Sequence, residues 1–190
     1  KYKSKDDDDD SDDSEIHAHV TCEADKIEDL HKSANLSLAV ASGVYLARDL
    51  GNAPPNDLYP MAFAEQAIEF GKEHDNVKVT IINYEQALSM GMGGLVGVGM
   101  GSARKPCMVI FEINPDMPGP SPCIVGKGIT FDTGGISLKP PPSMDEMKYD
   151  MHGSATTFGV MQALVASGHK ERVIGVTCMA ENMPSSNAQR

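Results

Sequence analysis

The stretch VGKGITFDTGGISLK, residues 125–139, decides how this chain is interpreted. It continues the apolar segment 121–125, which is typical of a buried strand, so Lys127 and Asp132 are expected in the loop that leaves this strand. Four glycines in the stretch allow the backbone to bend tightly and to approach a ligand closely. Charged residues at the carboxyl end of a strand lie where α/β proteins usually bind ligands, so we place the chemistry of the chain here.

A second charged segment follows after a proline-rich turn. Residues 144–150 read MDEMKYD, so two lysines and two aspartates are close in the sequence: Lys127, Asp132, Lys139 and Asp150. Two carboxylates that converge from separate loops raise each other's pKa unless a cation, such as a divalent metal ion, neutralises them. Each residue also has an ordinary structural explanation, namely solvated loop lysines, a turn-forming Asp132 and a helix N-cap at Asp150.

These residues resemble a known family of exopeptidases with two metal ions, the leucyl aminopeptidases. The resemblance extends from about Leu30 to Arg190, and its most specific parts are residues 125–139 and 145–153. Two further segments support it, NAPPNDLYP at 52–60 and AENMPSSNA at 180–188. A match of this length, with charged residues at the spacings of the family, is far more specific than a single short motif.

The resemblance implies a role for each charged residue. Lys127, Asp132 and Asp150 correspond to metal ligands, with Asp132 bridging two ions and the other two holding one of them. An amine binds a metal only in its deprotonated form, so Lys127 is expected to lose its proton to the site. Lys139 corresponds to a protonated electrophile that polarises the scissile carbonyl. Met147 corresponds to a wall of the pocket for the first substrate side chain, and core packing is its alternative interpretation.

The implied activity is the removal of amino-terminal residues from peptides, preferentially leucine and other bulky apolar residues. Two divalent metal ions, zinc or manganese with magnesium also possible, would activate a water molecule and anchor the free α-amine of the substrate. The resemblance further implies peptide substrates, a homohexamer and a cytoplasmic location. Cysteines without a CxxC pair and the lack of an apolar run of membrane-spanning length also favour a reducing setting, either the cytosol or the stroma of an organelle, without a membrane.

The sequence departs from the family in one respect. The family completes its metal site with a later segment, Asn-Thr-Asp-Ala-Glu-Gly-Arg, which supplies an aspartate, a glutamate and an arginine. This segment does not occur in the 190 residues. We therefore expect the chain to be a fragment of a longer polypeptide that by itself binds zinc or manganese weakly and has no peptidase turnover.

Two alternative functions are a DNA-binding or structural relative of the same fold and a non-catalytic paralogue. The formal net charge of −11 disfavours binding to a phosphate backbone, so no nucleic-acid partner is expected. Part of this charge belongs to an acidic block at 6–13, which is interpreted as a solvated loop or tail. A paralogue that keeps the fold only for assembly stays open, and the later aspartate, glutamate and arginine would distinguish it from an enzyme.

The domain organisation follows from helical periodicity. Apolar residues recur at helical spacing across 29–50, and the segment GNAPP at 51–55 ends the pattern abruptly. We interpret 29–50 as the linker helix that joins two domains in the resembled family. Residues 1–28 would then be the tail of an amino-terminal domain with the acidic loop, and 51–190 the first, truncated part of the metallopeptidase catalytic domain.

The remaining pattern predicts helices at residues 61–74, 84–90 and 153–167, and strands at 16–22, 77–83, 107–114, 121–125 and 172–180. This alternation predicts an α/β fold with a largely buried sheet. The resemblance makes the fold more specific, since it implies a three-layer α/β/α architecture with a mixed sheet, present here in part. The glycine-rich segment 91–101 has neither spacing of a phosphate-binding loop, so it is interpreted as a tight bend.

Overall fold

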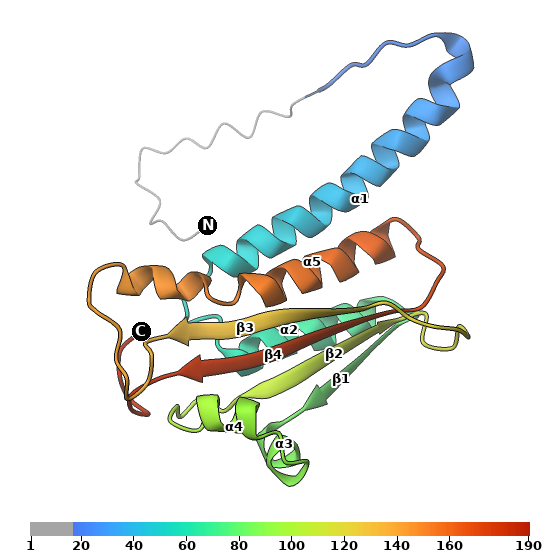
Figure 1. The fold of residues 1–190 in the computed structure, drawn as a ribbon. Coiled ribbons are helices and arrows are strands. Elements are labelled where there is room, and N and C mark those ends of the chain that lie inside the picture. The colour runs from blue at the N-terminus through green and yellow to red at the C-terminus, as the bar shows by residue number, and fades with distance from the viewer. Residues whose placement is uncertain (1–16) are drawn as a thin grey trace.

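The structure, a computed structural model, describes residues 17–190 (Figure 1). The acidic block at 6–13 therefore lies outside the described residues, and its interpretation stays a prediction. The elements in chain order are η1 (Ala24–Lys26), α1 (Ile27–Asn52), α2 (Pro60–Glu73), β1 (Val77–Ile82), α3 (Tyr84–Ser89), α4 (Gly93–Gly99), β2 (Cys107–Ile113), β3 (Cys123–Asp132), η2 (Met144–Tyr149), α5 (His152–Ala166) and β4 (Val173–Asn182).

The four strands form one mixed sheet in the order β1-β2-β4-β3. Strand β2 pairs antiparallel with β1 and with β4, whereas β3 pairs parallel with β4. Residues along β2 alternate between buried and half-buried, so one face of this strand points into the core. The predicted α/β fold with a mixed sheet is confirmed.

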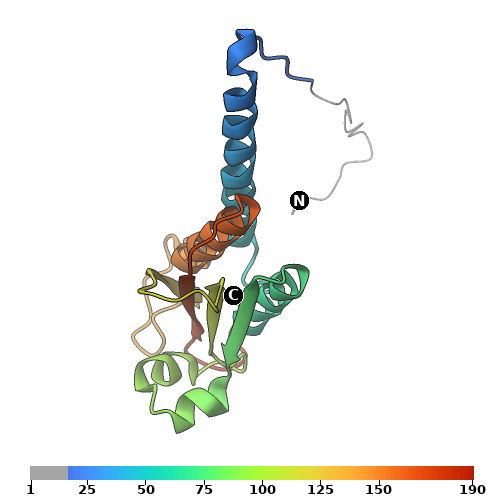
Figure 2. The same ribbon diagram turned by 90° about the vertical axis from the view of Figure 1, so that its right-hand side faces the viewer.

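Helices lie on both sides of the sheet (Figures 1 and 2). Helices α2 and α5 pack directly on one face, and α1 packs on the outer side of α5. The short helices α3 and α4 lie on the opposite side, with α4 against β4. This arrangement corresponds to the predicted three-layer architecture. In the described residues, one of the two helical layers contains only the short helices α3 and α4.

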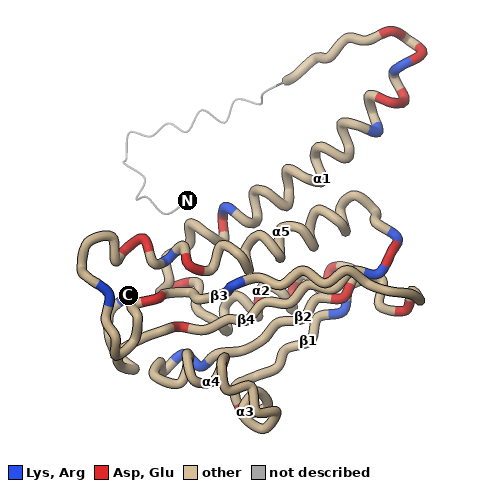
Figure 3. The backbone as a smooth tube through the Cα atoms, in the orientation of Figure 1, with Lys and Arg blue, Asp and Glu red and all other residues tan. Residues whose placement is uncertain are grey.

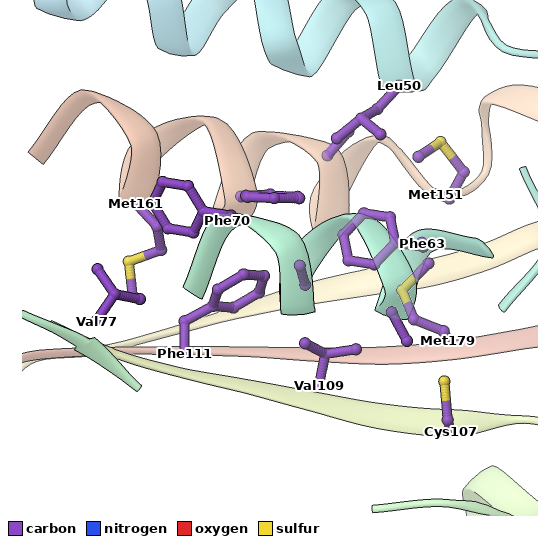
Figure 4. Packing of buried hydrophobic residues seen from close by; sticks show 14 of the residues in the cluster. Leu50, Phe63, Phe70, Val77, Cys107, Val109, Phe111, Met151, Met161 and Met179 are labelled. Carbon is purple, nitrogen blue, oxygen red and sulfur yellow. The ribbon is translucent and has the colours of Figure 1, made fainter. Parts of the chain in front are cut away.

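The core fills the space between α2, α5 and the sheet (Figure 4). Phe158 of α5 is its centre, because its ring centroid lies 5.6 Å from that of Phe63, 5.3 Å from that of Phe70 and 4.9 Å from that of Phe111. Tilted and edge-on aromatic pairs at such separations are favourable beyond the area that they bury. The core therefore holds α5 firmly against the sheet, and the loop before α5 carries Asp150.

The helix predicted at 29–50 is present as α1, and it extends well beyond the body of the molecule (Figure 2). Its role as a linker between two domains stays a prediction. Its last turns contact α5 closely, since a Cβ atom on Gly43 would overlap the carbonyl oxygen of Gly159. Several apolar residues of α1 are exposed, among them Leu36 and Leu38 in its first half and Tyr45 in its second. No helix in the described part of the chain combines the length and the hydrophobicity that a membrane crossing requires.

Three predictions about elements are wrong. Residues 17–22 of the strand predicted at 16–22 form no strand, because none of the sheet's described strands pairs with them, and residue 16 lies outside the described residues. The bend predicted at 91–101 contains α4, which forms despite the low helix propensity of its glycines and buries Val96. Lys127 and Asp132 lie within β3 and not in a loop after it, because pairing with β4 continues to Asp132.

Candidate functional site

A β-bulge places two of the predicted site residues on one face of the sheet. Lys127 pairs with Cys178 of β4, and Asp132 pairs with Asn182, four positions farther along β4. Residues an even number of positions apart in a strand point to the same face. A register shift between Ile129 and Phe131 inserts one extra residue, and without it Asp132 would face the other side.

The carboxylate of Asp132 is largely enclosed, and both of its oxygens accept hydrogen bonds. Its Oδ1 accepts hydrogen bonds from the Gly134 N–H at 3.0 Å and from Asn182 Nδ2 at 2.7 Å, while Oδ2 accepts one from Lys139 Nζ at 2.7 Å. Burial alone would raise the pKa of Asp132, but these hydrogen bonds, together with the charge of Lys139, outweigh it and lower that pKa below its ordinary value. Asp132 is therefore ionised at neutral pH.

The loop after β3 returns Lys139 to Asp132. Gly134 and Gly135 both have positive φ, 90° and 69°, which side chains other than glycine rarely adopt. The Lys139 N–H then donates to the Thr133 carbonyl oxygen at 2.9 Å and closes the loop. These two glycines make the tight bend that the sequence predicts for this stretch.

Met147 of η2 lies beside the same charges. Its sulfur is 3.1 Å from Lys139 Nζ, and the residue is half-buried. It is not part of the hydrophobic core between α2, α5 and the sheet. This position does not support the core-packing interpretation, and the role of Met147 as a wall of a substrate pocket stays a prediction.

The other two predicted residues form a second ion pair. Lys127 Nζ lies 3.1 Å from Asp150 Oδ2, with the Lys127 side chain 60% exposed and that of Asp150 26% exposed. Asp150 Oδ2 is itself buried and has no hydrogen-bond partner in the structure, so this contact is an ion pair without hydrogen-bond geometry. Asp150 is not the N-cap of α5, because Met151 takes that position.

Close packing of α5 on β3 brings Asp150 to Lys127. A Cβ atom on Gly126 would lie 2.5 Å from the Gly153 carbonyl oxygen, and one on Gly153 would lie 2.7 Å from the Lys127 nitrogen. Ser154 Oγ also donates to the Gly126 carbonyl oxygen at 3.1 Å. Only glycines permit this approach, so their place in the sequence explains where the loop before α5 lies.

The structure thus brings the four charged residues together as two pairs, Lys127 with Asp150 and Lys139 with Asp132. Figure 3 shows acidic and basic segments close together at this end of the sheet. Carboxylate oxygens and a deprotonated amine are suitable donors for a divalent cation, and the buried Asp150 oxygen without a hydrogen-bond partner fits such a ligand.

The donor set is nevertheless small. Within residues 17–190, no group of three or more His, Cys, Asp or Glu side chains is arranged to hold a metal ion. A closed metal site with protein ligands usually needs four or more donors. The described residues therefore supply part of a ligand set, and the metal-binding roles of Lys127, Asp132 and Asp150 stay predictions.

Sequence reasoning did not single out Asn182, which contacts Asp132 directly. The available signal was its place in the segment 180–188, which was used only as support for the family resemblance. A contact across a parallel strand pair depends on the register of β3 and β4, and this register cannot be read from either strand alone.

Comparisons with known proteins show the family of the chain. The model of the cytosol aminopeptidase family, catalytic domain, matches residues 45–190. A probable cytosol aminopeptidase of Pseudomonas syringae pv. tomato is 42% identical over 174 residues, which cover 90% of this chain and 35% of that protein. The chain thus spans about a third of the length of the curated relatives that it matches.

Solved structures show the same similarity. The bottromycin maturation enzyme BotP in complex with Mn matches with a TM-score of 0.75 and 38% identity, covering 84% of this chain and 34% of that one. The cytosol aminopeptidase from Coxiella burnetii matches with a TM-score of 0.71 and 29% identity, covering 84% and 34%. Since the family model covers most of its residues, the chain belongs to the cytosol aminopeptidase family.

Proposed function

We propose that this chain carries part of the active site of a metallo-aminopeptidase, which removes amino-terminal residues from peptides and prefers leucine and other bulky apolar residues. The proposal rests on two ion pairs toward the end of β3. Lys127 pairs with Asp150, and Lys139 pairs with Asp132. Membership of the cytosol aminopeptidase family supports an aminopeptidase activity in general.

Lys127, Asp132 and Asp150 would hold the metal ions, with Asp132 shared between two of them. When bound, divalent ions supply a more acidic water molecule and a positive anchor for the substrate amine. Asp132 is ready for this role, because its hydrogen bonds keep it ionised at neutral pH. Lys127 would leave its ion pair with Asp150 and lose its proton before its nitrogen could act as a ligand.

Lys139 would keep its proton and act on the substrate. In the structure its ammonium group donates to Asp132 and lies against Met147. Once a metal ion takes its place at Asp132, the ammonium group would donate a hydrogen bond to the carbonyl oxygen of the scissile peptide bond, where negative charge develops. Met147 would contact the first side chain of the substrate, and a thioether there favours unbranched or γ-branched apolar groups.

We further propose manganese or zinc as the metal, a cytoplasmic location and a homohexameric assembly. Manganese has support from BotP, which was solved in complex with Mn. Peptides are the proposed substrates, and the net charge of −11 argues against a nucleic acid.

The second candidate is a non-catalytic member of the family. It is favoured by the small number of metal donors among residues 17–190. An aspartate, a glutamate and an arginine encoded after residue 190 would complete the site and argue for the enzyme. A gene product without them would argue for a structural role.

The test is hydrolysis of leucine p-nitroanilide by the full-length gene product, with manganese, with zinc and after chelation. We expect metal-dependent turnover that the variant Asp132→Ala abolishes. The control variant Asp116→Ala should leave turnover unchanged, because Asp116 is exposed in the loop before β3 and Asp132 lies at the other end of that strand. The same assay on the 190-residue chain alone should give no turnover. Turnover that survives both chelation and Asp132→Ala would refute the proposal.

A further inference from the structure

Asn182, the last residue of β4, holds Asp132 and the loop that follows it. Its side-chain Nδ2 donates to Asp132 Oδ1 at 2.7 Å. Its carbonyl oxygen accepts from the Thr133 N–H at 3.0 Å and from Thr133 Oγ1 at 2.7 Å. Gly135 lies so close that a Cβ atom there would be 2.7 Å from Asn182 Oδ1. One residue therefore fixes both the carboxylate and the start of the loop.

The contact with Asn182 also determines which oxygen of Asp132 is available. The N–H group of Gly134 donates to the same Oδ1, so this oxygen has two protein donors. The other oxygen, Oδ2, accepts a hydrogen bond from the ammonium group of Lys139. A cation that replaces the Lys139 ammonium group would find Oδ2 already oriented, without a loss of the hydrogen bonds to Oδ1.

Glu181, the residue before Asn182, fixes the end of β4 in place through its buried contacts. Glu181 is fully buried, and its carboxylate accepts a hydrogen bond from Ser102 Oγ at 2.6 Å. It also forms ion pairs with Arg104, at 3.5 Å, and with Arg190, whose Nε lies 2.8 Å away. Successive residues of a strand point to opposite faces, so Glu181 anchors the strand from one side while Asn182 reaches Asp132 from the other.

A neutral amide is well suited to orient the Asp132 carboxylate. A lysine or arginine in its place would also orient the carboxylate, but its positive charge would repel a metal ion. The neutral amide of Asn182 orients Asp132 and leaves its negative charge for a cation. Residues that hydrogen-bond to metal ligands in this way typically change metal affinity or activity by about 10- to 100-fold when they are removed.

We infer that Asn182 is a positioning residue, which holds the Asp132 carboxylate so that Oδ2 is presented to a divalent metal ion. The inference rests on the proposed function, since it assumes that Asp132 binds metal. It adds a residue that acts only through its hydrogen bond to Asp132 and through the loop at Thr133.

The test is calorimetric titration of the metal-free, full-length gene product with MnCl2. Asn182→Ala removes the amide, and Asn182→Leu removes it while keeping the volume of the side chain. Asn187→Ala is the matched control, because Asn187 is exposed in the same carboxyl-terminal segment. We expect manganese affinity to fall about 10- to 100-fold in both Asn182 variants and to be unchanged in the control. The melting temperature of each metal-free variant, measured in parallel, shows whether the fold is intact.

The outcomes separate the inference from the function on which it rests. If the parent protein takes up no manganese, or if Asp132→Ala takes it up normally, the metal site itself is wrong. If the parent binds manganese, Asp132→Ala does not, and both Asn182 variants bind with parental affinity, only the role of Asn182 is overturned. A lower melting temperature with unchanged manganese affinity would likewise show a structural role and contradict the inference.

Discussion

Lys127 and Asp132 lie on the same face of β3, although they are five positions apart in the sequence. In a regular strand an odd separation puts two side chains on opposite faces. The extra residue is Thr130, which is buried and whose Oγ1 donates to the Ala180 carbonyl oxygen at 3.3 Å. A bulge of one residue thus brings together the lysine and the aspartate that would share a metal site.

Deletion of Thr130 should therefore abolish manganese binding by the full-length protein, because it would turn Asp132 to the opposite face of the sheet. Calorimetric titration with MnCl2 measures this effect. Deletion of Gly119, in the exposed loop before β3, is the control and should leave binding unchanged. Parental affinity in the folded Thr130 deletion would show that the bulge does not determine the site.

The two lysines of the site should respond differently to substitution. Lys139→Ala should leave the metals bound and lower kcat by about 100- to 1,000-fold, because its role is to stabilise developing charge. Lys127→Ala and Asp150→Ala should lower the metal content itself. Elemental analysis of the purified variants, together with rates on leucine p-nitroanilide, distinguishes these effects. If Lys139→Ala lost metal while Asp150→Ala kept it, the assigned roles would be inverted.

Stability should depend on pH through Glu112. Arg172 Nη2 donates to Glu112 Oε1 at 2.6 Å and, against the opposing effect of burial, lowers the pKa of Glu112 below its usual 4.5. A carboxyl with a lowered pKa in the folded state contributes stability above its unfolded pKa, and this is lost as the pH falls through the folded pKa.

Glu112→Gln should accordingly lower the free energy of unfolding by about 1 kcal/mol at neutral pH. The difference from the parent should shrink as the pH falls below 4.5. Urea denaturation across this range measures it, with the exposed Glu65→Gln as control. A difference that grew on acidification would mean that the sign of the coupling is wrong.

The cysteines should differ sharply in reactivity. Burial, assisted by the nearby Cys178, raises the pKa of Cys107 from 9.0 to about 12, whereas Cys123 is exposed. Since the thiolate is the reactive form, iodoacetamide at about pH 8 should label Cys123 in the native protein and Cys107 only after denaturation. Peptide mapping by mass spectrometry reads out both sites, and equal rates at the two cysteines would contradict the burial of Cys107.

The contact of α1 with α5 should tolerate no side chain at Gly43. Gly43→Ala should lower the free energy of unfolding by about 1–3 kcal/mol, because the methyl group would overlap the backbone of α5. Gly97→Ala in α4 has open space around it and should raise stability by up to about 1 kcal/mol. Thermal or urea denaturation measures both changes, and a neutral Gly43→Ala would mean that the two helices separate readily.

Regular periodicity explains which elements the sequence predicts well. The helix expected at 29–50 is α1, Ile27–Asn52, and the strand expected at 107–114 is β2, Cys107–Ile113. The first has apolar residues at helical spacing, and the second is an apolar run of strand length that only Glu112 interrupts. Helix α4 is not predicted, because its glycines have low intrinsic helix propensity; in the folded chain its Val96 is buried.

The candidate site was predictable as a group of residues but not as an arrangement. The sequence places Lys127, Asp132, Lys139 and Asp150 in one short region, and the structure shows which lysine pairs with which aspartate. That pairing depends on the bulge in β3 and on the tight packing of α5, both of which are tertiary features. For the same reason the contact of Asn182 with Asp132 became visible only in the folded chain.

Strand β3 has a partner on one side only among the described strands, and Val125 on this strand is 69% exposed. An edge of this kind offers free backbone donors and acceptors to a strand of another molecule, which is how many proteins begin to aggregate. The ten residues Cys123–Asp132 that carry Lys127 and Asp132 therefore also form an edge at which separate 190-residue chains can associate. Expression of this chain by itself will require a means to shield that edge, and the same shield must leave Lys127 and Asp132 free.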